Sequence, residues 1–367
     1  MGRNPFRKRD QIRVKPVGLG KAATNCAKLH SCNYAVETPG IQSFVAPLAW
    51  WVHSCLFLGL HCTLAHFRPR RPVMSIRSLV TVVLNWCAEE DSAKAIASIL
   101  TQGEPGVTVL IVDNASPDGS GDRLAARFPS LPYLQTGANL GYAGGNQRAI
   151  EWALERNADA VLLINDDATL QPHALGALRS AMDENPRLGG CAPTVLYGPP
   201  HHDRIWWAGG AFVSHRGCAV HWHMGEHVEA LPSSSVVQVT ALSGCVMLLR
   251  TKALRDAGGL DPAFFSYVED AELSLRFRAR GWELAWIPTA MAHHHCPYPQ
   301  PDPSPWAITQ LDRNRRLLAS RHYRGRTRLQ FTAWYYPSRV VVALRYLAKG
   351  DAARAAAVWR GMTAPLP

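Results

Sequence analysis

The sequence predicts an α/β fold built on an open, mostly parallel β-sheet. Short β-branched runs alternate along the chain with segments whose apolar residues recur at helical spacing, which is the pattern of βαβ units. Carboxylates directly follow two of these runs, at the strand ends where open α/β sheets bind ligands. With 367 residues, of which 47% are apolar and 18% charged, the chain is large enough to bury a complete core.

The net charge of +11 is unevenly distributed. Residues 1–73 contain 11 Lys and Arg against 2 acids, residues 74–311 contain 16 against 24, and residues 312–360 contain 12 against 2. A nucleic-acid-binding core would carry its own basic stripe, so the distribution argues against nucleic acid as a partner. We therefore divide the chain into a basic extension (1–73), an α/β domain (74–311) and a basic helical tail (312–367).

The basic extension allows three interpretations. Residues 41–67 are apolar enough to suggest a membrane helix, but Pro47 and three histidines interrupt them. The longest stretch without a histidine is about half of the ~20 residues that a membrane span needs. The segment is otherwise a disordered or membrane-touching extension, or it lies upstream of a true start at Met74 and is translated by mistake. We base no function on it.

The nine cysteines form no CxxC pair, and those after residue 73 are scattered singly among apolar or glycine-rich neighbours. This is typical of buried thiols in a reducing compartment rather than of a disulfide framework or a zinc ribbon. The sequence therefore predicts a cytoplasmic location.

The first elements of the domain form a βαβ unit. Residues 79–86 and 107–116 are the β-branched strands, and residues 89–102 between them place four apolar side chains on one helical face. A second round follows: a strand at 132–136, a glycine-rich turn at 137–146, a helix at 147–157 and a strand at 160–165.

The glycine-rich turn is not a dinucleotide-binding fingerprint. A GxGxxG motif should follow the first strand, where residues 84–92 ("LNWCAEEDS") contain no glycine. An ATP-binding P-loop is excluded as well, because no GxxxxGK[ST] occurs. A tight helix start explains the turn, and backbone without Cβ atoms would additionally let a ligand approach closely.

The carboxylates after the strands have a definite chemistry. Asp113 follows the second strand, and Asp166 and Asp167 follow the fourth. A divalent cation takes oxygen ligands and eases the departure of a nucleoside diphosphate, while a second carboxylate accepts hydrogen bonds from the ribose or the base. Such a site binds a nucleotide without a P-loop. The alternative for the Asp166–Asp167 pair is an Asx turn or a helix N-cap.

Seven blocks between residues 78 and 325 resemble, in order and spacing, the family 2 glycosyltransferases with the GT-A fold, and among them the bacterial rhamnosyltransferase-like branch. The blocks are VVLNW, VDNASPDGS, NLGYAGGNQRAI, LLINDDATL, SGCVMLLRTKAL, GGLDPAFFSYVEDAELSLRFRARGW and RNRRLL.

The resemblance implies an inverting hexosyltransferase of polysaccharide or cell-wall synthesis. Such an enzyme moves a sugar from a donor of the dTDP-rhamnose or UDP-sugar class to a glycan or lipid-linked acceptor, with Mg²⁺ or Mn²⁺. It also implies a nucleotide-sugar half (74–190) and an acceptor half (191–311).

Individual roles follow by position in these blocks. Asp113 matches the acid that contacts the nucleotide base, Asp167 the metal-binding acid of the DxD motif, and Asp166 its middle residue. Asn165 stands where the first Asp of DxD would be and supplies no charge, so lower metal affinity is expected. The resemblance places the following residues in the nucleotide-sugar pocket: Asn85, Asp113, Asn139, Gly141, Asn146, Asn165, Asp166, Ser243 and Gly244.

The ED motif and the histidine run supply the remaining chemistry. Asp270 matches the family's general base, with Glu269 beside it, and helix capping is the alternative for these acids. A carboxylate there accepts the proton of the acceptor hydroxyl as its oxygen attacks the anomeric carbon. Adjacent side chains of an extended segment alternate in direction, so one histidine is expected near the metal. Counting from Pro288 favours His294, then His293.

Two features concern the acceptor side. Trp206 and Trp207 resemble stacking platforms for a sugar ring or a lipid carrier, with a core position as the alternative. The tail combines arginines and aromatic residues with an apolar helix from about 338 to 348. This suits peripheral contact with the inner face of the plasma membrane, or else a self-packed helical tail.

Two other classes of protein remain as alternatives. A nucleotidyltransferase would carry a glycine-rich basic loop after the first strand. A non-catalytic module that binds nucleotides or sugars would keep the fold and lose the acids.

Overall fold

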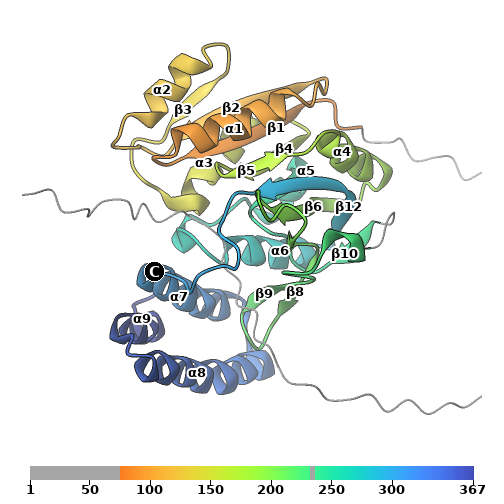
Figure 1. Cartoon of the computed structure of the whole chain (residues 1–367). Helices are drawn as coiled ribbons and strands as arrows, with labels where there is room; N and C mark the ends of the chain where they lie inside the picture. The colour runs from red at the N-terminus through yellow and green to blue at the C-terminus, as the bar shows by residue number, and fades with distance from the viewer. Residues whose placement is uncertain (1–74, 232–235) are drawn as a thin grey trace, which may run out of the picture.

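A computed structural model describes residues 75–231 and 236–367 of the chain. The basic extension (1–73), together with its membrane-helix and start-site interpretations, lies outside the described residues. A mixed ten-stranded sheet forms the core, and three helices at the C-terminal end pack against one side of the domain (Figure 1). The prediction of an α/β fold with a mostly parallel sheet is confirmed.

The first half of the domain alternates strands and helices, as expected. Its strands β1, β2 and β4 are runs of buried Val, Ile and Leu, because each lies inside the sheet with helices on both faces. The elements are β1 (Leu79–Asn85), α1 (Glu89–Leu100), β2 (Val107–Asp113), α2 (Ser120–Arg127), β3 (Tyr133–Gln135), α3 (Gly141–Glu155), β4 (Ala160–Asn165), β5 (Ala168–Leu170) and α4 (Ala174–Glu184).

The strand order creates a topological switch point at the end of β1. The order β3-β2-β1-β4 places β1 between β2 and β4, and all three pairings are parallel. The chain therefore winds outward from β1 on one side and returns on the other, which is the topological switch point where α/β sheets bind ligands. In register, Asn85 lies opposite Asp113, and Leu84 lies opposite Asn165.

The second half continues the same sheet. Strand β11 is antiparallel to both β4 and β6, and β12 is parallel to β6. The elements are β6 (Leu188–Tyr197), β7 (Ile205–Trp207), β8 (Gly210–Val213), β9 (Cys218–His221), the 3₁₀ turn η1 (Val228–Ala230), β10 (Val237–Val239), β11 (Val246–Arg250), α5 (Thr251–Ala257), the 3₁₀ turn η2 (Pro262–Phe264), α6 (Glu269–Ala279) and β12 (Glu283–His294).

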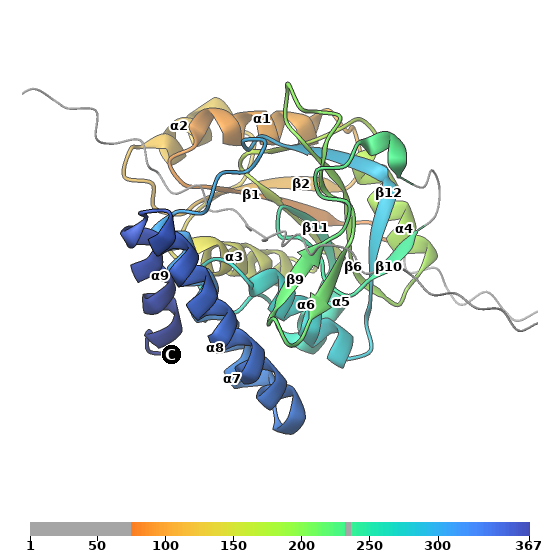
Figure 2. The ribbon, with the colours of Figure 1, turned by 60° about the horizontal axis from the view of Figure 1, so that its bottom comes forward.

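Helices cover both faces of this sheet. Figure 2 shows α1 and α2 above the strands β1 and β2, with α3 below them, and α5 and α6 on the same lower side. Apolar side chains of α1, among them Ala95, Ile96 and Ile99, are buried against the sheet, whereas its charged residues face solvent.

The C-terminal tail consists of α7 (Pro305–His322), α8 (Gly325–Ala348) and α9 (Ala352–Thr363). Helix α8 reaches the turn of the β8–β9 hairpin, where Gly217 leaves room for the ring of Phe331. The predicted tail helix at about 338–348 is thus the second half of a longer helix that contains Pro337. No helix in the described part of the chain is both long and apolar enough to cross a bilayer.

One element begins earlier than the sequence suggests. The glycine-rich turn is the first turn of α3, which begins at Gly141 rather than at residue 147. Glycine is a poor helix former, but Gly141 has a φ of +69°, and an added Cβ would lie 2.3 Å from the carbonyl oxygen of Phe265. Close packing against another loop of the protein therefore requires glycine here and overrides the local preference.

Candidate active site

Asn85 and Asp113 form a buried polar network at the ends of β1 and β2. The Asn85 Nδ2 atom donates to Asp113 Oδ1 over 2.8 Å and to the hydroxyls of Ser116 and Ser120, each over 3.0 Å. Asp113 Oδ2 accepts from Gln135 Nε2 over 2.6 Å. Both carboxylate oxygens are thus already engaged, so a base N–H would join or displace these donors.

The start of α3 borders this network. Asn139 Oδ1 accepts from the backbone N–H of Gly141 over 2.9 Å, and buried Asn146 donates to the carbonyl of Tyr142 over 3.0 Å. The N–H of Ala143 donates to the carbonyl of Phe265 over 2.9 Å. Because Asn114, the residue after Asp113, donates to Asn139 Oδ1 and to the carbonyl of Gly141, the start of α3 connects the end of β2 to the loop that precedes α6.

Asp167 and His294 face each other below the end of β4. The imidazole Nε2 atom of His294 lies 3.2 Å from Asp167 Oδ1, and both side chains are at most 1% exposed. The sheet creates this pair: β5 is antiparallel to β12, with Ala168 opposite His294. Asp166, the other acid of the turn, is only half-buried. A carboxylate and an imidazole separated by 126 residues thus meet in the interior.

The neighbouring histidines point elsewhere. His293 Nε2 lies 3.2 Å from Gln171 Nε2, and His295 Nε2 lies 3.1 Å from the hydroxyl of Thr169. The two rings are 6.4 Å apart. The alternation expected for an extended segment is observed: the ring of His294 faces the Asp167 carboxylate, whereas His295 reaches Asp167 through its backbone N–H, which donates to the Asp167 carbonyl over 2.8 Å.

Trp206 and Trp207 are core residues in the structure. Their exposed fractions are 0% and 1%, so neither ring presents a face to a sugar. The position favours the core alternative over the stacking platform. Trp206 instead packs edge-on against the ring of His294, with 4.5 Å between centroids. It forms the wall behind the Asp167–His294 pair.

Asp270 lies at the start of α6, held by the strand-end segment before β11. Its Oδ2 atom accepts from the N–H of Gly244 over 2.9 Å, and the hydroxyl of Tyr142 donates to the Gly244 carbonyl over 2.6 Å. Burial raises the pKa of Tyr142 well above its usual value, so this phenol stays protonated and acts as a donor. Ser243, also predicted in the pocket, is 1% exposed.

The two acids of the ED pair lie in different hydrogen-bonding environments. Burial raises the pKa of both carboxyls, and for Glu269 the adjacent Asp270 raises it further. The backbone N–H of Gly244 opposes this at Asp270 by stabilising its charged form. Among the described residues Glu269 Oε2 is buried without a hydrogen-bond partner. We infer that Asp270 ionises first, which suits it better as a base.

One short segment connects the two acidic centres. Gly244 binds Asp270, and the next residue, Cys245, accepts through its carbonyl from the N–H of Asn165 over 2.9 Å. Asn165 is followed directly by the acids of the β4–β5 turn. The acid assigned to proton transfer and the pair assigned to metal binding therefore lie on either side of residues 243–245.

The loop before α6 is strained, and Asn314 of α7 holds it. Phe265, Tyr267 and Val268 all have positive φ, at +60°, +74° and +74°, which costs non-glycine residues free energy. The buried Nδ2 atom of Asn314 donates to three carbonyls of this loop, over 2.6 to 2.8 Å: those of Phe264, Ser266 and Tyr267. The sequence analysis missed Asn314, although it lies in the quoted block RNRRLL.

The family comparison decides what this arrangement belongs to. A family model described as "Glycosyl transferase family group 2" matches residues 160–364. The chain belongs to this family. It is therefore an enzyme, an inverting glycosyltransferase, and the predictions of family and of reaction class are confirmed.

Two relatives illustrate the range of this glycosyltransferase family. The chain is 31% identical over 216 residues to the N-acetylglucosaminyl-diphospho-decaprenol L-rhamnosyltransferase of Mycobacterium tuberculosis. The aligned region covers 54% of this chain and 70% of the relative. It is 25% identical over 261 residues to the low-salt glycan biosynthesis hexosyltransferase Agl10 of Haloferax volcanii, and this alignment covers 69% of the chain and 80% of the relative.

A solved structure supports the fold of the glycosyltransferase. GalNAc-T7, crystallised with UDP, GalNAc and Mn²⁺, superposes with a TM-score of 0.55 at 11% identity. The superposition covers 77% of this chain and 55% of that protein. At this identity the match concerns the GT-A architecture alone.

A divalent cation fits the Asp167–His294 pair by the chemistry of the two donors. Carboxylate oxygen and imidazole nitrogen both ligate Mn²⁺, and Mg²⁺ is commonly held by one or two carboxylates together with substrate phosphates and water. The described residues contain no group of three or more His, Cys, Asp or Glu side chains placed around one metal position. A cation here would thus depend on the phosphates of the donor for its remaining ligands.

Proposed function

We propose that this glycosyltransferase moves a sugar of the rhamnose or hexose type from a nucleotide-diphospho-sugar to a glycan or lipid-linked acceptor. The reaction uses a divalent cation. It belongs to polysaccharide or cell-envelope synthesis and takes place at the cytoplasmic face of the membrane. The observation that supports this most is the pairing of Asp167 with His294 on one side of residues 243–245 and of Asp270 on the other. The diphosphate of the donor needs a bound cation, which the first pair would hold, and the hydroxyl of the acceptor needs a base, which Asp270 would supply.

The residues divide the reaction between them. Asp167 and His294 would hold the cation, which neutralises charge on the departing diphosphate when bound. Asp270 accepts the proton of the acceptor hydroxyl while the acceptor oxygen bonds to the anomeric carbon and the bond to the diphosphate breaks. One displacement on the face opposite the leaving group inverts the anomeric centre. No serine or cysteine is needed as a nucleophile.

The polar ends of β1 and β2 provide the nucleotide side of the proposed site. Asn85 and Asp113 lie at the switch point of the sheet. There the Asn85 amide and the Asp113 carboxylate would form hydrogen bonds with the base and the ribose of the nucleotide. Asn139, just before α3, and Gly141, its first residue, accept from the side chain of Asn114, which follows Asp113, and Asn146 lies further along the same helix. The similarity to an N-acetylglucosaminyl-diphospho-decaprenol L-rhamnosyltransferase supports dTDP-rhamnose as the first donor to test.

Donor binding tests the nucleotide and metal parts of the proposal. Thermal shifts should be measured for the full chain with dTDP, UDP, GDP and ATP, each with and without Mn²⁺. Stabilisation by dTDP or UDP that requires Mn²⁺ is expected. Preference for a nucleoside triphosphate would instead indicate a nucleotidyltransferase-like site. Mass spectrometry of products from a panel of activated sugars would then identify the transferred sugar.

A pair of isosteric variants tests the base. Asp270→Asn should lower kcat by about 1,000-fold or more while donor affinity changes less than about threefold, since general base catalysis contributes on the order of 10²–10⁴ in rate. Glu269→Gln mimics an acid that is already protonated and should lower kcat far less. The reverse ranking of the two variants would assign the base to Glu269.

A further inference from the structure

Helix α8 carries a continuous apolar stripe on its outer face. The stripe residues are Leu329, Tyr336, Val340, Leu344 and Leu347, with exposed fractions of 69%, 38%, 44%, 58% and 54%. Their spacings of seven, four, four and three residues place them on one side of the helix. Exposed large apolar side chains grouped in this way mark a contact surface, whereas single ones need no explanation.

The stripe does not belong to the core of the tail. The opposite face of α8 buries Phe331, Tyr335, Arg339 and Tyr346, and this face holds the helix to the rest of the protein. Phe331 and Tyr335 stack with 4.9 Å between ring centroids. Figure 1 shows α8 at the lower edge of the molecule, beyond α7 and α9. Replacing a stripe residue should therefore leave the fold intact.

The charge of the tail around the stripe is strongly positive, although Lys349 at the end of α8 pairs with Asp302 over 3.9 Å. Helix α8 contains four arginines and no acid, and between residues 305 and 367 the only acids are Asp312 and Asp351. Asp312 is buried against Arg315 and Arg339, and Asp351 caps α9. The solvent-facing cations near the stripe are thus not balanced by acids of the tail.

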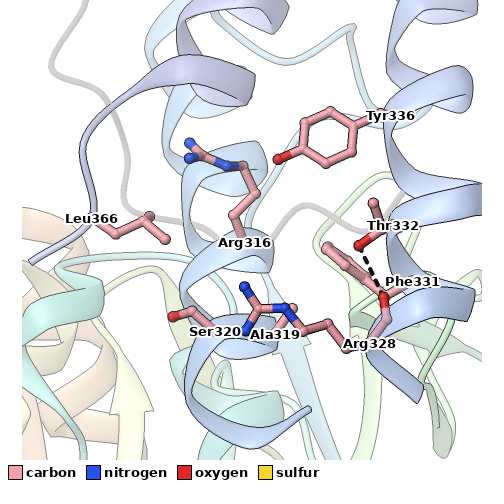
Figure 3. A pocket seen from close by; sticks show the side chains of 8 residues that line it. All are labelled: Arg316, Ala319, Ser320, Arg328, Phe331, Thr332, Tyr336 and Leu366. Carbon is pink, nitrogen blue, oxygen red and sulfur yellow. Dashed lines mark hydrogen bonds between the residues drawn. The ribbon is translucent and has the colours of Figure 1, made fainter. Parts of the chain in front are cut away.

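A small pocket between α7 and α8, lined by both apolar and polar side chains, adjoins the stripe. It has a volume of about 120 Å³ and is lined by Arg316, Ala319, Ser320, Arg328, Phe331, Thr332, Tyr336 and Leu366. Figure 3 shows Arg316 extending from α7 and Arg328 crossing from α8, with the Tyr336 hydroxyl directed toward the Arg316 side chain. Tyr336 belongs to both the pocket and the stripe, so the two features form one continuous surface.

The pocket has the chemistry of a phosphate site. Guanidinium groups bind phosphate through paired N–H donors, and the pocket contains two of them together with the hydroxyl of Tyr336. The hydroxyls of Ser320 and Thr332 already donate to the carbonyls of Leu317 and Arg328. Arg316 already donates to the carbonyls of Gly361 and Ala364, which fixes its position. Within the described ranges neither Arg316 nor Arg328 forms an ion pair with a carboxylate.

We propose that the α8 stripe and the Arg316–Arg328 pocket together dock the enzyme on an anionic phospholipid bilayer. The stripe enters the boundary between headgroups and acyl chains, and the pocket takes the phosphate of one lipid headgroup. A second copy of the chain is a poorer occupant, because it would bring the same arginine-rich faces together. The biological role of this docking, access to a lipid-linked acceptor, rests on the proposed function. The docking surface itself does not.

Vesicle binding of the full-length chain tests the stripe. Co-sedimentation is measured with two kinds of vesicle: phosphatidylcholine alone, and phosphatidylcholine with about 30% phosphatidylglycerol, which makes the surface anionic. We expect the protein to bind the anionic vesicles, and we expect this binding to weaken as the salt concentration rises. The double variant Leu344→Ser and Leu347→Ser should bind at least tenfold more weakly. Leu100→Ser is the matched control, since Leu100 is 48% exposed on α1, and it should bind like the wild type.

A second pair of variants tests the pocket. Arg328→Gln should weaken binding to anionic vesicles about fivefold, the effect of one arginine at a lipid surface. Arg148→Gln, which removes an exposed arginine of α3, should change it less than twofold. Equal losses in the two variants would assign the effect to net charge and overturn the pocket.

Several outcomes would overturn the docking surface as a whole. The first is that the stripe variants bind vesicles as well as the wild type does. The second is that inorganic phosphate stabilises the protein although it binds no vesicles. The third is that the protein is a dimer that Leu344→Ser dissociates. Transfer to a water-soluble acceptor, measured in parallel, separates this inference from the proposed function. Vesicle binding without transfer would refute the function alone, and transfer without vesicle binding would refute the docking surface alone.

Discussion

Asn314 offers the sharpest test of how the fold prepares the catalytic loop. Its single Nδ2 group donates to the carbonyls of Phe264, Ser266 and Tyr267, so Asn314→Leu removes two N–H donors that three buried acceptors share. Leaving a buried acceptor unsatisfied costs about 1–3 kcal/mol, so the variant should lose roughly 2–4 kcal/mol of local stability. The loop is also strained at three residues and keeps its conformation only while its surroundings impose it.

We expect this loss to appear in catalysis more than in folding. The strained loop can relax alone, because it leads into Glu269 and Asp270 at the start of α6, whereas the sheet does not depend on it. Asn314→Leu should therefore lower kcat by at least tenfold, change the donor Kd little and lower Tm modestly. Steady-state kinetics, calorimetric titration of the donor nucleotide and thermal unfolding measure the three quantities.

A matched variant makes the result decisive. Asn185 also donates through its side chain, to Glu283 over 2.8 Å, and it belongs to neither the catalytic loop nor the polar strand ends. Asn185→Leu should lower Tm and leave kcat within about twofold. If Asn314→Leu keeps wild-type kcat, or lowers Tm and kcat only as Asn185→Leu does, then Asn314 is an ordinary structural contact and does not position the base.

Three further predictions concern the acids and the metal. Because burial raises the pKa of Asp270 above the ordinary range of an aspartate and a base must be ionised, kcat/KM should fall as the pH is lowered through this raised pKa, and a midpoint in the ordinary aspartate range or below it would contradict the assignment. Asp167→Ala should weaken Mn²⁺-dependent donor binding at least tenfold, by calorimetry, and an unchanged Mn²⁺ requirement would remove Asp167 as a ligand. Asn165→Asp adds the missing charge of the DxD motif and should tighten Mn²⁺ binding severalfold; weaker or equal binding would show that position 165 does not face the cation.

The positions of β1 and β4 were predictable because both strands are buried on both faces. The run 160–165 was predicted to within a residue at both ends, and 79–86 ends one residue early, at Asn85. The alternation of the three histidines was predictable too, since it depends only on the two-residue repeat of an extended chain. It correctly separated His294, which faces Asp167, from its neighbours.

Contacts between distant segments were not predictable from local pattern. Nothing in the glycine-rich turn announces that Phe265 packs on Gly141, so the sequence placed the helix start six residues late. Trp206 was assigned to the acceptor because tryptophan often stacks on sugars, yet it packs behind His294. The role of Asn314 depends on carbonyls 47 to 50 residues away, which carry no sequence signature of their own.

The continuity of the sheet has a consequence for engineering. A boundary between donor and acceptor halves at residue 190 falls within β6, which pairs with β11 on one side and β12 on the other. A chimera joined there would bring together two fragments of one strand, each shaped by a different parent. Exchanging acceptor preference between related enzymes should therefore succeed through loop grafts, such as the segment from β7 to β10, rather than by swapping half-domains.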